Sequence, residues 1–415
     1  MGSRFRLAAS APLPARGLLV VAVAAVLVAT LLPTTGEKPD ISLCLVCGER
    51  GLSDALANVL LYMPLGAAMA LCGWARPRAL IAPALLSASI ELAQTWIPGR
   101  DPSLGDVTFN ALGAAVGLAV VATAPLWLAP RPRVRLLLSG LAALAVVAAF
   151  AATGILLQPD PSRSPYWGQW TPDLGYLEWY RGRVVSASLG PRELPSGPLG
   201  ESGQVRGLLL ARAPLDVHAV AGPRVPALAS LFSIYDAGQR EIALLGPDRD
   251  DFVFRYRTRA AAALLDEPDL RAVGALRGVT PGESLAVAVR ADGRGYCLVV
   301  NGRAACGRGF TLGSGWAVLY YPEMFPQWLK LLLDEAWVAG LLVPLGFWLQ
   351  RRPAGLLLVA AAAAALWVAP AATGLVATPF GELAGAGVGL GLGVALRRLV
   401  SARSAATALR ESVEA

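Results

Sequence analysis

Charged residues and histidine are scarce in this chain. Only 16% of its 415 residues are charged and 55% are hydrophobic, which excludes an ordinary soluble protein and indicates the membrane class. His218 is the single histidine. A catalytic Ser-His or Cys-His pair would need His218, but this residue lies in a β-like stretch and is better explained as a surface or hydrogen-bonded side chain. The sequence also lacks the spacing of a zinc site and a Walker-type phosphate-binding loop.

Positive charge is in excess, with a formal net charge of +7. Such an excess can indicate a nucleic-acid partner. The basic residues, however, form short clusters between apolar runs, which is how membrane proteins encode their topology. We therefore expect a membrane lipid as a partner and no nucleic acid.

Long apolar runs predict a multi-pass membrane protein, because a run of about 17 to 25 residues can cross a bilayer as a helix. The first run could instead be a cleaved signal peptide, but its length and the absence of a clear cleavage site favour an uncleaved helix. Eight runs qualify, at residues 17–33, 54–73, 79–97, 104–128, 136–157, 327–349, 354–373 and 379–396.

The basic clusters set the expected orientation of these spans. If all eight runs cross the membrane, every cluster falls on one side, which the positive-inside rule makes the cytoplasm. We therefore expect both termini in the cytoplasm and residues 158–326 outside it. The clusters comprise Arg4, Arg6, Arg16, Arg76, Arg78, Arg131, Arg133, Arg135, Arg351, Arg352, Arg397, Arg398 and Arg403.

Polar residues gather at the outer ends of the second, third and fourth spans. Those within one span are three or four residues apart, so they share a helix face. Ionisable groups in a membrane are costly unless they face one another or water, which predicts a shared polar pocket. Helix capping by Ser103 and Asp106, or hydrogen bonding between helices, is the structural alternative. The pocket candidates are Asp54, Asn58, Glu91, Gln94, Arg100, Asp106 and Asn110.

Short β-like runs at regular spacing fill the segment between the fifth and sixth spans, which predicts an all-β sandwich. The turn signal Asn301-Gly302 places Cys297 opposite Cys306 in a non-hydrogen-bonded pair, so we predict a cross-strand disulfide. Cys44 and Cys47 could also pair, or could form a redox or metal site. Cys72 is expected to be a small packing residue. We predict no metal site.

Three segments resemble the VanZ-like family of bacterial membrane proteins. They are "NVLLYMPLG" at 58–66, "SIELAQ" at 89–94 and "GRDPSLGDVTFNALGAAVG" at 99–117, and the resemblance covers about residues 54–120. The family is named for a protein linked to low-level teicoplanin resistance, so the resemblance implies a role in the envelope, at the bacterial inner membrane, but no particular reaction. Gly113 and Gly117 form a GxxxG pair that lets another helix approach closely.

The C-terminal spans resemble a degenerate second copy of this region, at about residues 334–396. Asp334–Gly346 aligns without gaps on Asp54–Gly66. Glu382–Gly389 then aligns on Asp106–Gly113. The second copy loses most of the polar residues and keeps the glycines, so a pseudo-symmetric scaffold is one explanation and chance similarity of glycine-rich helices is the other. The glycines expected at its helix contacts are Gly385 and Gly389.

The inserted segment resembles the laminin G-like or concanavalin A-like lectin sandwich in its pattern of strands and hairpins. This resemblance implies glycan binding, sometimes with calcium, but no diagnostic site residue is present. We therefore predict no cofactor.

Together these patterns predict an α-helical polytopic membrane bundle with an inserted all-β sandwich. The expected parts are a membrane domain at 1–157, the sandwich at 158–326, a second membrane domain at 327–396 and a cytoplasmic tail at 397–415. The expected function is binding of a cell-surface glycan or lipid-linked cell-wall precursor, with a link to glycopeptide resistance. The alternative is an enzyme or transporter that acts on an envelope lipid through the polar pocket.

Overall fold

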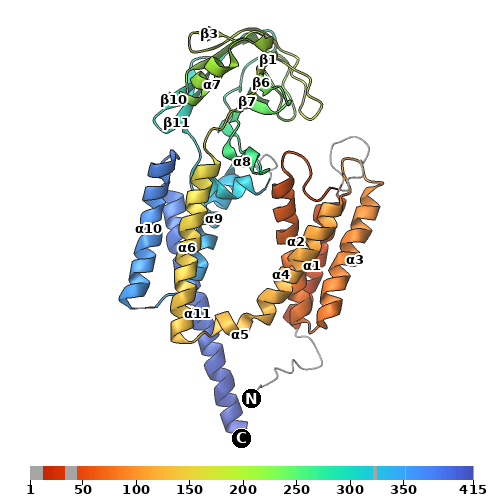
Figure 1. Cartoon of the computed structure of the whole chain (residues 1–415), viewed down its shortest axis with the longest axis vertical. Helices are drawn as coiled ribbons and strands as arrows, with labels where there is room; N and C mark the ends of the chain where they lie inside the picture. The colour runs from red at the N-terminus through yellow and green to blue at the C-terminus, as the bar shows by residue number, and fades with distance from the viewer. Residues whose placement is uncertain (1–12, 33–43, 321–324, 351, 415) are drawn as a thin grey trace. The chain divides into compact units, whose positions relative to one another are not determined.

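The computed structural model describes residues 13–32, 44–320, 325–350 and 352–414, with side chains up to residue 402 (Figure 1). The expected basic positions Arg4, Arg6 and Arg351 lie outside the described residues. The chain divides into two compact units. Unit 1 contains residues 1–138, 264–266 and 395–415, and unit 2 contains residues 139–263 and 267–394.

The expected helices are present, and their apolar runs explain most of their boundaries. In the described part of the chain, seven helices are long and apolar enough to cross a membrane: α1 (Leu13–Leu31), α2 (Gly51–Leu71), α4 (Leu104–Ala122), α6 (Pro132–Leu156), α9 (Gln327–Trp348), α10 (Pro353–Thr373) and the Phe380–Ala402 part of α11 (Phe380–Glu414). The remaining expected span, the third one at 79–97, forms α3 (Arg76–Gln94), which is less apolar than the other seven. The short α5 (Ala124–Leu128) follows α4.

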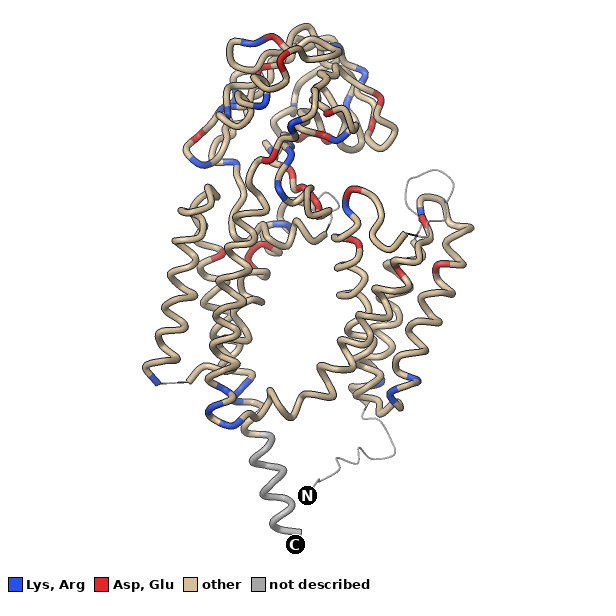
Figure 2. The backbone as a smooth tube through the Cα atoms, in the orientation of Figure 1, with Lys and Arg blue, Asp and Glu red and all other residues tan. Residues whose placement is uncertain are grey.

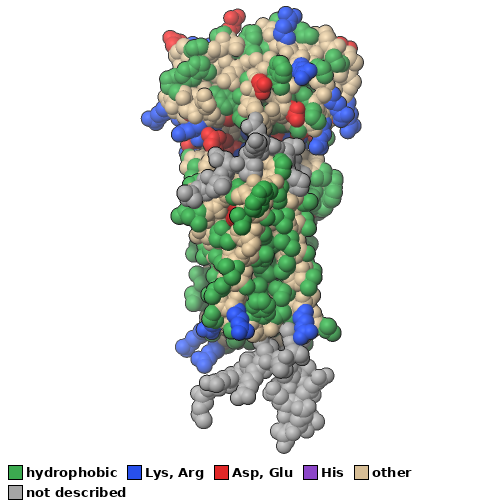
Figure 3. Space-filling view, turned by 90° about the vertical axis from the view of Figure 1, so that its right-hand side faces the viewer, with side chains coloured by type: hydrophobic (Ala, Val, Ile, Leu, Met, Phe, Trp, Pro, Cys, Tyr) green, Lys and Arg blue, Asp and Glu red, His purple; other side chains and the backbone are tan. Residues whose placement is uncertain are grey.

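The long helices present apolar surface along most of their length. Charged residues are rare in their middle parts and concentrate towards their ends (Figure 2). Figure 3 shows hydrophobic side chains over the helices on the face in view, with basic side chains gathered at one end of them. This distribution is the one that a lipid bilayer requires of the helices that cross it.

The inserted segment is a sandwich of two six-stranded antiparallel sheets, as predicted. The first sheet has the order β4-β1-β6-β7-β8-β9 and the second β12-β11-β10-β5-β2-β3. Short helical segments connect the strands: α7 (Ser202–Leu210), α8 (Arg259–Ala262) and the 3₁₀ helix η1 (Gly313–Val318). The strands are β1 (Tyr166–Trp170), β2 (Arg183–Leu189), β3 (Arg192–Glu193), β4 (Gly197–Leu199), β5 (Leu215–Val220), β6 (Phe232–Asp236), β7 (Glu241–Asp248), β8 (Asp251–Tyr256), β9 (Leu270–Ala272), β10 (Ser284–Asp292), β11 (Gly295–Val300) and β12 (Arg303–Arg308).

The central strand of the first sheet is covered on both faces. All five residues of β6 are buried, whereas strands with one open face alternate between buried and exposed side chains. The neighbouring strands are covered in part by Leu177, which packs against Leu244 of β7 and Val253 of β8. The middle of this sheet therefore offers no open face on which a glycan could lie.

The hairpin of β11 and β12 carries the predicted disulfide. Asn301 and Gly302 both have positive φ, at 45° and 79°, as a tight hairpin turn of this type requires. Val300 pairs with Arg303. Cys297 and Cys306 are joined in a disulfide, and their Cα atoms lie 3.8 Å apart. Cys44 and Cys47 are also bonded to each other.

Replacing both Cys297 and Cys306 by serine should lower the free energy of unfolding of the sandwich by roughly 1–3 kcal/mol, because the closed loop is short. Tryptophan fluorescence during urea unfolding of the full chain would measure the change. The Cys72→Ala variant is the matched control, since Cys72 is the free cysteine of the described residues. Equal stability of the double variant and the wild type would contradict the prediction.

Glycines bring α4 against α2 at backbone distance. A Cβ atom added to Gly113 would lie 2.3 Å from the Val59 carbonyl oxygen, and one added to Gly117 would lie 1.9 Å from the Met63 carbonyl oxygen. Gly66 makes the reciprocal contact from α2, with its Cβ position 2.0 Å from the Ala114 oxygen. Only glycine fits at such positions.

The same contacts recur between α9 and α11. A Cβ atom added to Gly389 would lie 2.1 Å from the Ala339 oxygen, and in the alignment these two residues match Gly113 and Val59. The two remaining contacts also match: Gly393 with Val343, and Gly346 with Leu390, each at 2.2 Å. Gly385 approaches Glu335 in the same way, at 2.7 Å. The two helix pairs therefore pack in the same register.

Candidate functional site

The predicted polar residues of unit 1 meet through one serine at the start of α4. The Asn58 Nδ2 donates to Asp106 Oδ1 at 2.7 Å. The Ser103 amide donates to Glu91 Oε2 at 2.8 Å, and the Ser103 hydroxyl accepts from the Asp106 amide at 3.0 Å. Asp54 lies in the first turn of α2, close enough for its charge to act on Asp106. The structure thus brings residues of α2, α3 and α4 into one bonded group, and Ser103 is its centre.

A buried polar atom beside this group, Asn110 Oδ1, has no hydrogen-bond partner in the described part of the chain, and the buried Tyr62 hydroxyl lies beside Ser87. Tyr62 is fully buried and Asn110 is 2% exposed. The Nδ2 of Asn110 donates to the Ser87 hydroxyl at 2.9 Å. Sequence reasoning missed Tyr62 and Ser87 because both lie in apolar runs, although Tyr62 follows Asn58 by one helical turn and so shares its face.

Arg100 and Gln94 bind the last carbonyl groups of α1. The guanidinium of Arg100 donates to the Leu32 oxygen at 2.9 and 3.0 Å and to the Ala29 oxygen at 2.8 Å. The Nε2 of Gln94 donates to the Thr30 oxygen at 2.8 Å. These hydrogen bonds satisfy carbonyl groups at the C-terminal end of α1, which have no partner within the helix. The partial negative charge of that end attracts a cation. The sequence predicts Arg100 and Glu91 in one pocket, and in the structure the hydrogen bonds of Arg100 go to the end of α1.

Glu91→Gln and Arg100→Ala should therefore act independently on stability. Glu91 binds the Ser103 amide and Arg100 binds α1, so the two side chains share no partner. Thermal unfolding of the two single variants and the double variant in detergent should give additive losses within about 0.5 kcal/mol. A coupling well above that value would show that the two residues do interact.

A cavity of about 300 Å³ lies within unit 2, between one end of the sandwich and the first turns of α9 and α11. None of its charged residues was singled out from the sequence as a site. Its acidic residues are Asp269, Asp334, Glu335 and Glu382, and its basic residues are Arg271, Arg308 and Lys330. Figure 2 shows acidic residues near the upper ends of the helices of unit 2.

Groups of the η1 region donate to the acids of the helices. The Trp316 Nε1 donates to Asp334 Oδ1 at 2.5 Å. The Gly313 amide donates to Glu382 Oε2 at 3.0 Å, and the Thr311 hydroxyl donates to the other oxygen of Glu382. In the alignment of the two copies, Asp334 and Glu382 occupy the positions of Asp54 and Asp106. Glu382 lies in the first turn of α11, as Asp106 does in α4, whereas Asp334 lies further along its helix than Asp54 does because α9 already begins at Gln327.

The sandwich side of the cavity holds a buried ion network. Arg271 bonds to Asp248 at 2.6 Å and to Asp269 at 2.7 Å, and Lys330 lies 3.6 Å from Asp269. Burial alone would raise the pKa of Asp269, but Arg271 and Lys330 hold it below its usual value. The same carboxylates raise the pKa of Arg271. These groups are ionised and compensate one another.

Arg308 and Glu335 also line the cavity. Unlike the residues of the ion network, neither has a side-chain partner in the described part of the chain. The Nε atom of Arg308 is buried without a hydrogen bond. A guanidinium and a carboxylate are thus open to a ligand in this cavity.

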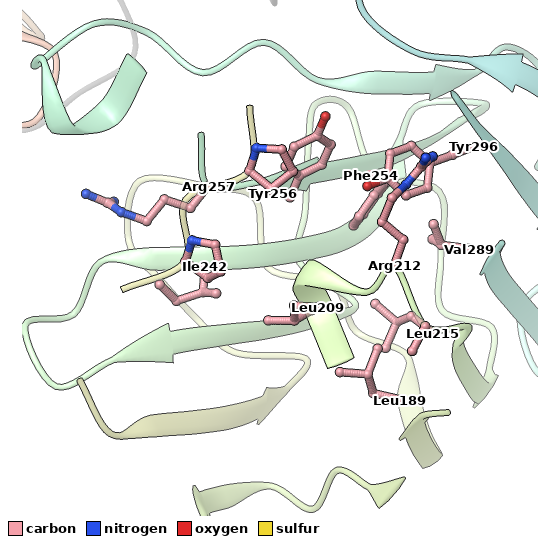
Figure 4. Close-up of a pocket in the computed structure, with 13 residues that line it drawn as sticks. Leu189, Leu209, Arg212, Leu215, Ile242, Phe254, Tyr256, Arg257, Val289 and Tyr296 are labelled. Carbon is pink, nitrogen blue, oxygen red and sulfur yellow. The ribbon is translucent and has the colours of Figure 1, made fainter. Parts of the chain in front are cut away.

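A second cavity, of about 30 Å³, lies inside the sandwich (Figure 4). Its lining includes Phe254, Tyr256 and Tyr296, and the Arg212 guanidinium lies 4.1 Å from the ring centre of Tyr296. Figure 4 shows Arg257 pointing away from these rings. The space holds no more than about two water molecules, so it is a gap in the core and not a ligand site.

The geometry defines a multi-pass membrane protein with an inserted β-sandwich. Residues 20–127 match the model of the VanZ/LLP1 family, so this part of the chain is VanZ-like. The match extends beyond the 54–120 resemblance and takes in most of α1. No curated protein and no solved structure matches the chain. The cavity of unit 2 lies outside the matched residues.

Proposed function

We propose that this VanZ-like protein of the bacterial cell envelope binds an envelope lipid by its headgroup, in the 300 Å³ cavity of unit 2. The ligand is a phospholipid or a lipid-linked glycan, and binding leaves it chemically unchanged. The observation that carries the proposal is the position of the cavity at the first turns of α9 and α11, two helices that are apolar enough to cross a membrane.

The ends of membrane-spanning helices lie at the level of the lipid headgroups. A cavity there is open to headgroups and closed to most soluble molecules of the cytoplasm. Its volume is at the lower limit of small-molecule sites, which start at about 300 Å³. The open guanidinium of Arg308 suits a phosphate, which it can bind through two parallel hydrogen bonds. A lipid-linked cell-wall precursor in this site would connect the protein to glycopeptide susceptibility.

The test is the lipid that leaves the membrane with the protein. Native mass spectrometry of the full chain from its own membrane should show a bound phosphate-bearing lipid, and Arg308→Gln should reduce its occupancy by about tenfold. Arg303→Gln is the matched control, because Arg303 lies on the same strand, is exposed and does not line the cavity. Equal lipid occupancy in both variants would refute the proposal.

A second candidate is an enzyme or transporter that acts on an envelope lipid through the polar group of unit 1. The observation in its favour is the buried Asn110 Oδ1, which has no partner in the described part of the chain, together with the buried Tyr62 hydroxyl close to Glu91 and Asp106. The two functions differ in turnover: an enzyme changes the mass of the added lipid, and a binding protein does not. Mass analysis of lipids after incubation with wild type and Tyr62→Phe separates them.

The proposal places residues 158–326 outside the cytoplasm and both termini inside. In a Cys72→Ala background, Asp101→Cys should react with an impermeant maleimide on intact spheroplasts. Arg131→Cys should react only after permeabilisation. The basic clusters at the opposite helix ends support this orientation. If position 101 reacted only from the cytoplasmic side, the orientation of the protein would be the reverse of the proposed one.

A further inference from the structure

We infer that the ligand of the unit 2 cavity carries a positively charged amino group, which Asp334, Glu335 and Glu382 bind. This inference rests on the proposed lipid-binding function and specifies the chemistry of the headgroup.

The first argument is the balance of charge around the cavity. Arg271 is shared among Asp248, Asp269 and Asp251, at 2.6, 2.7 and 3.6 Å, and Lys330 lies beside Asp269. These two cations are therefore matched by three carboxylates on the sandwich side, and Arg308 is left as one cation of the lining against the three carboxylates on α9 and α11. In the described part of the chain, no ion pair within 4.0 Å involves the three carboxylates on α9 and α11. Their negative charge lies beside apolar helices, where an uncompensated charge is costly.

The second argument is that the surrounding donors favour the ionised carboxylates. The Gly313 N–H and the Trp316 indole N–H can only donate, so Glu382 Oε2 and Asp334 Oδ1 accept from them. The Thr311 hydroxyl donates to the other oxygen of Glu382. The two N–H groups hold one oxygen each of Glu382 and Asp334 as acceptors, which favours the ionised form of both carboxylates, and a bound cation would balance their charge.

The third argument concerns the kind of cation. A bare metal ion needs ligand atoms that converge on one point. Among the described residues, a set of three such ligand atoms within 4.8 Å of one another occurs only at Asp292, Cys297 and Cys306, and those cysteines are joined in a disulfide. The carboxylates of the cavity are more widely spaced. An ammonium group with three N–H donors can reach separated acceptors, and the lining residue Trp316 adds an aromatic surface that attracts cations.

Glu335 is the residue that tests the inference, because it has no partner in the described residues that its substitution would disturb. The probes are nanodiscs of phosphatidylglycerol that contain either phosphatidylethanolamine or its N-acetylated derivative, which keeps the phosphate and loses the positive charge. Lipid bound to the full chain is counted by native mass spectrometry. Soluble O-phosphoethanolamine is a third arm, which shows whether the amine must be part of a lipid. Glu193→Gln is the control, since Glu193 is exposed on β3.

The wild type and Glu193→Gln should bind phosphatidylethanolamine about tenfold more tightly than the N-acetylated lipid. Glu335→Gln should remove most of this preference while still binding lipid. Displacement of the lipid by O-phosphoethanolamine would support binding of the amine and would show that the ligand need not be a lipid.

Equal binding of the two lipids by the wild type would overturn the inference and leave the lipid-binding function intact. If Arg308→Gln lost all lipid binding while the wild type showed no preference for the amine, the inference would fail in the same way. No binding of either lipid by the wild type would overturn the proposed function itself.

Discussion

Gly393→Ala should destabilise the protein by at least about 3 kcal/mol, whereas Gly391→Ala, two residues away on the same helix, should be neutral or slightly stabilising. A Cβ atom at position 393 would lie 2.2 Å from the Val343 oxygen and 2.6 Å from the Phe347 nitrogen, and neither backbone atom can move without separating α9 from α11. At position 391 there is open space within 4 Å. Alanine there gains up to about 1 kcal/mol of helix propensity.

Thermal unfolding of the detergent-solubilised full chain would compare the two variants directly. Gly117→Ala, at the aligned position of the first copy, should repeat the effect of Gly393→Ala, because its Cβ position is 1.9 Å from the Met63 oxygen. Similar melting temperatures for the 391 and 393 variants would mean that α9 and α11 are not in backbone contact.

Arg271→Met should lower the free energy of unfolding by about 3–5 kcal/mol at neutral pH, because it leaves Asp248 and Asp269 buried without their cation. The side chains of Arg271 and Asp269 are 9% and 2% exposed. Arg224→Gln is the matched control. Its ion pair with Asp250 has side chains 65% and 37% exposed, so its loss should change stability by less than about 1 kcal/mol.

The wild type and the Arg271→Met variant should also respond differently to pH. In the wild type, the lowered pKa of Asp269 gives a contribution to stability that is present above the pKa of the unfolded chain and is lost as the pH falls through the lowered value. Without Arg271, Asp269 loses the largest of the attractions that lower its pKa, so the pKa of Asp269 is higher in the folded variant than in the folded wild type. Acidification therefore destabilises the variant less than the wild type, and the stability deficit of the variant shrinks as the pH falls. Urea unfolding between about pH 7 and about pH 3 measures this. A deficit that stays constant over that range would contradict the assignment.

Local patterns in the sequence predicted the elements well. Apolar runs predicted the helices, and a two-residue turn predicted the register from Val300–Arg303 to Leu298–Ala305, next to which the Cys297–Cys306 disulfide lies at a bulge. The glycine spacing predicted close helix contacts at Gly113 and Gly117. Each of these features depends on residues near one another in the chain. The exception is α3, which keeps the length of a span but is less apolar than the other seven helices.

Long-range contacts were harder to predict. Arg100 binds carbonyl groups of α1, and a backbone carbonyl leaves no mark in the sequence that could identify it as a partner. The cavity combines Asp269, Arg308, Asp334 and Glu382, which come from four separate segments. In the sequence, three of these residues resemble ordinary loop or helix-end charges. Only the fold brings them together, so no spacing rule could have found this site.

The matching glycine contacts bear on how ligand preference can change. The first copy follows a short connection between α1 and α2 that includes the Cys44–Cys47 disulfide, whereas the second copy follows the whole sandwich, which lies between α6 and α9. The helices of the second copy hold their register through Gly346, Gly389 and Gly393, which take no part in the cavity. One wall of the cavity is therefore fixed by helix packing, and the other, at Gly307–Ala317, belongs to an inserted module. Substitutions in that module can retune the headgroup that is accepted while the transmembrane scaffold stays constant, much as variable loops diversify binding on an invariant framework.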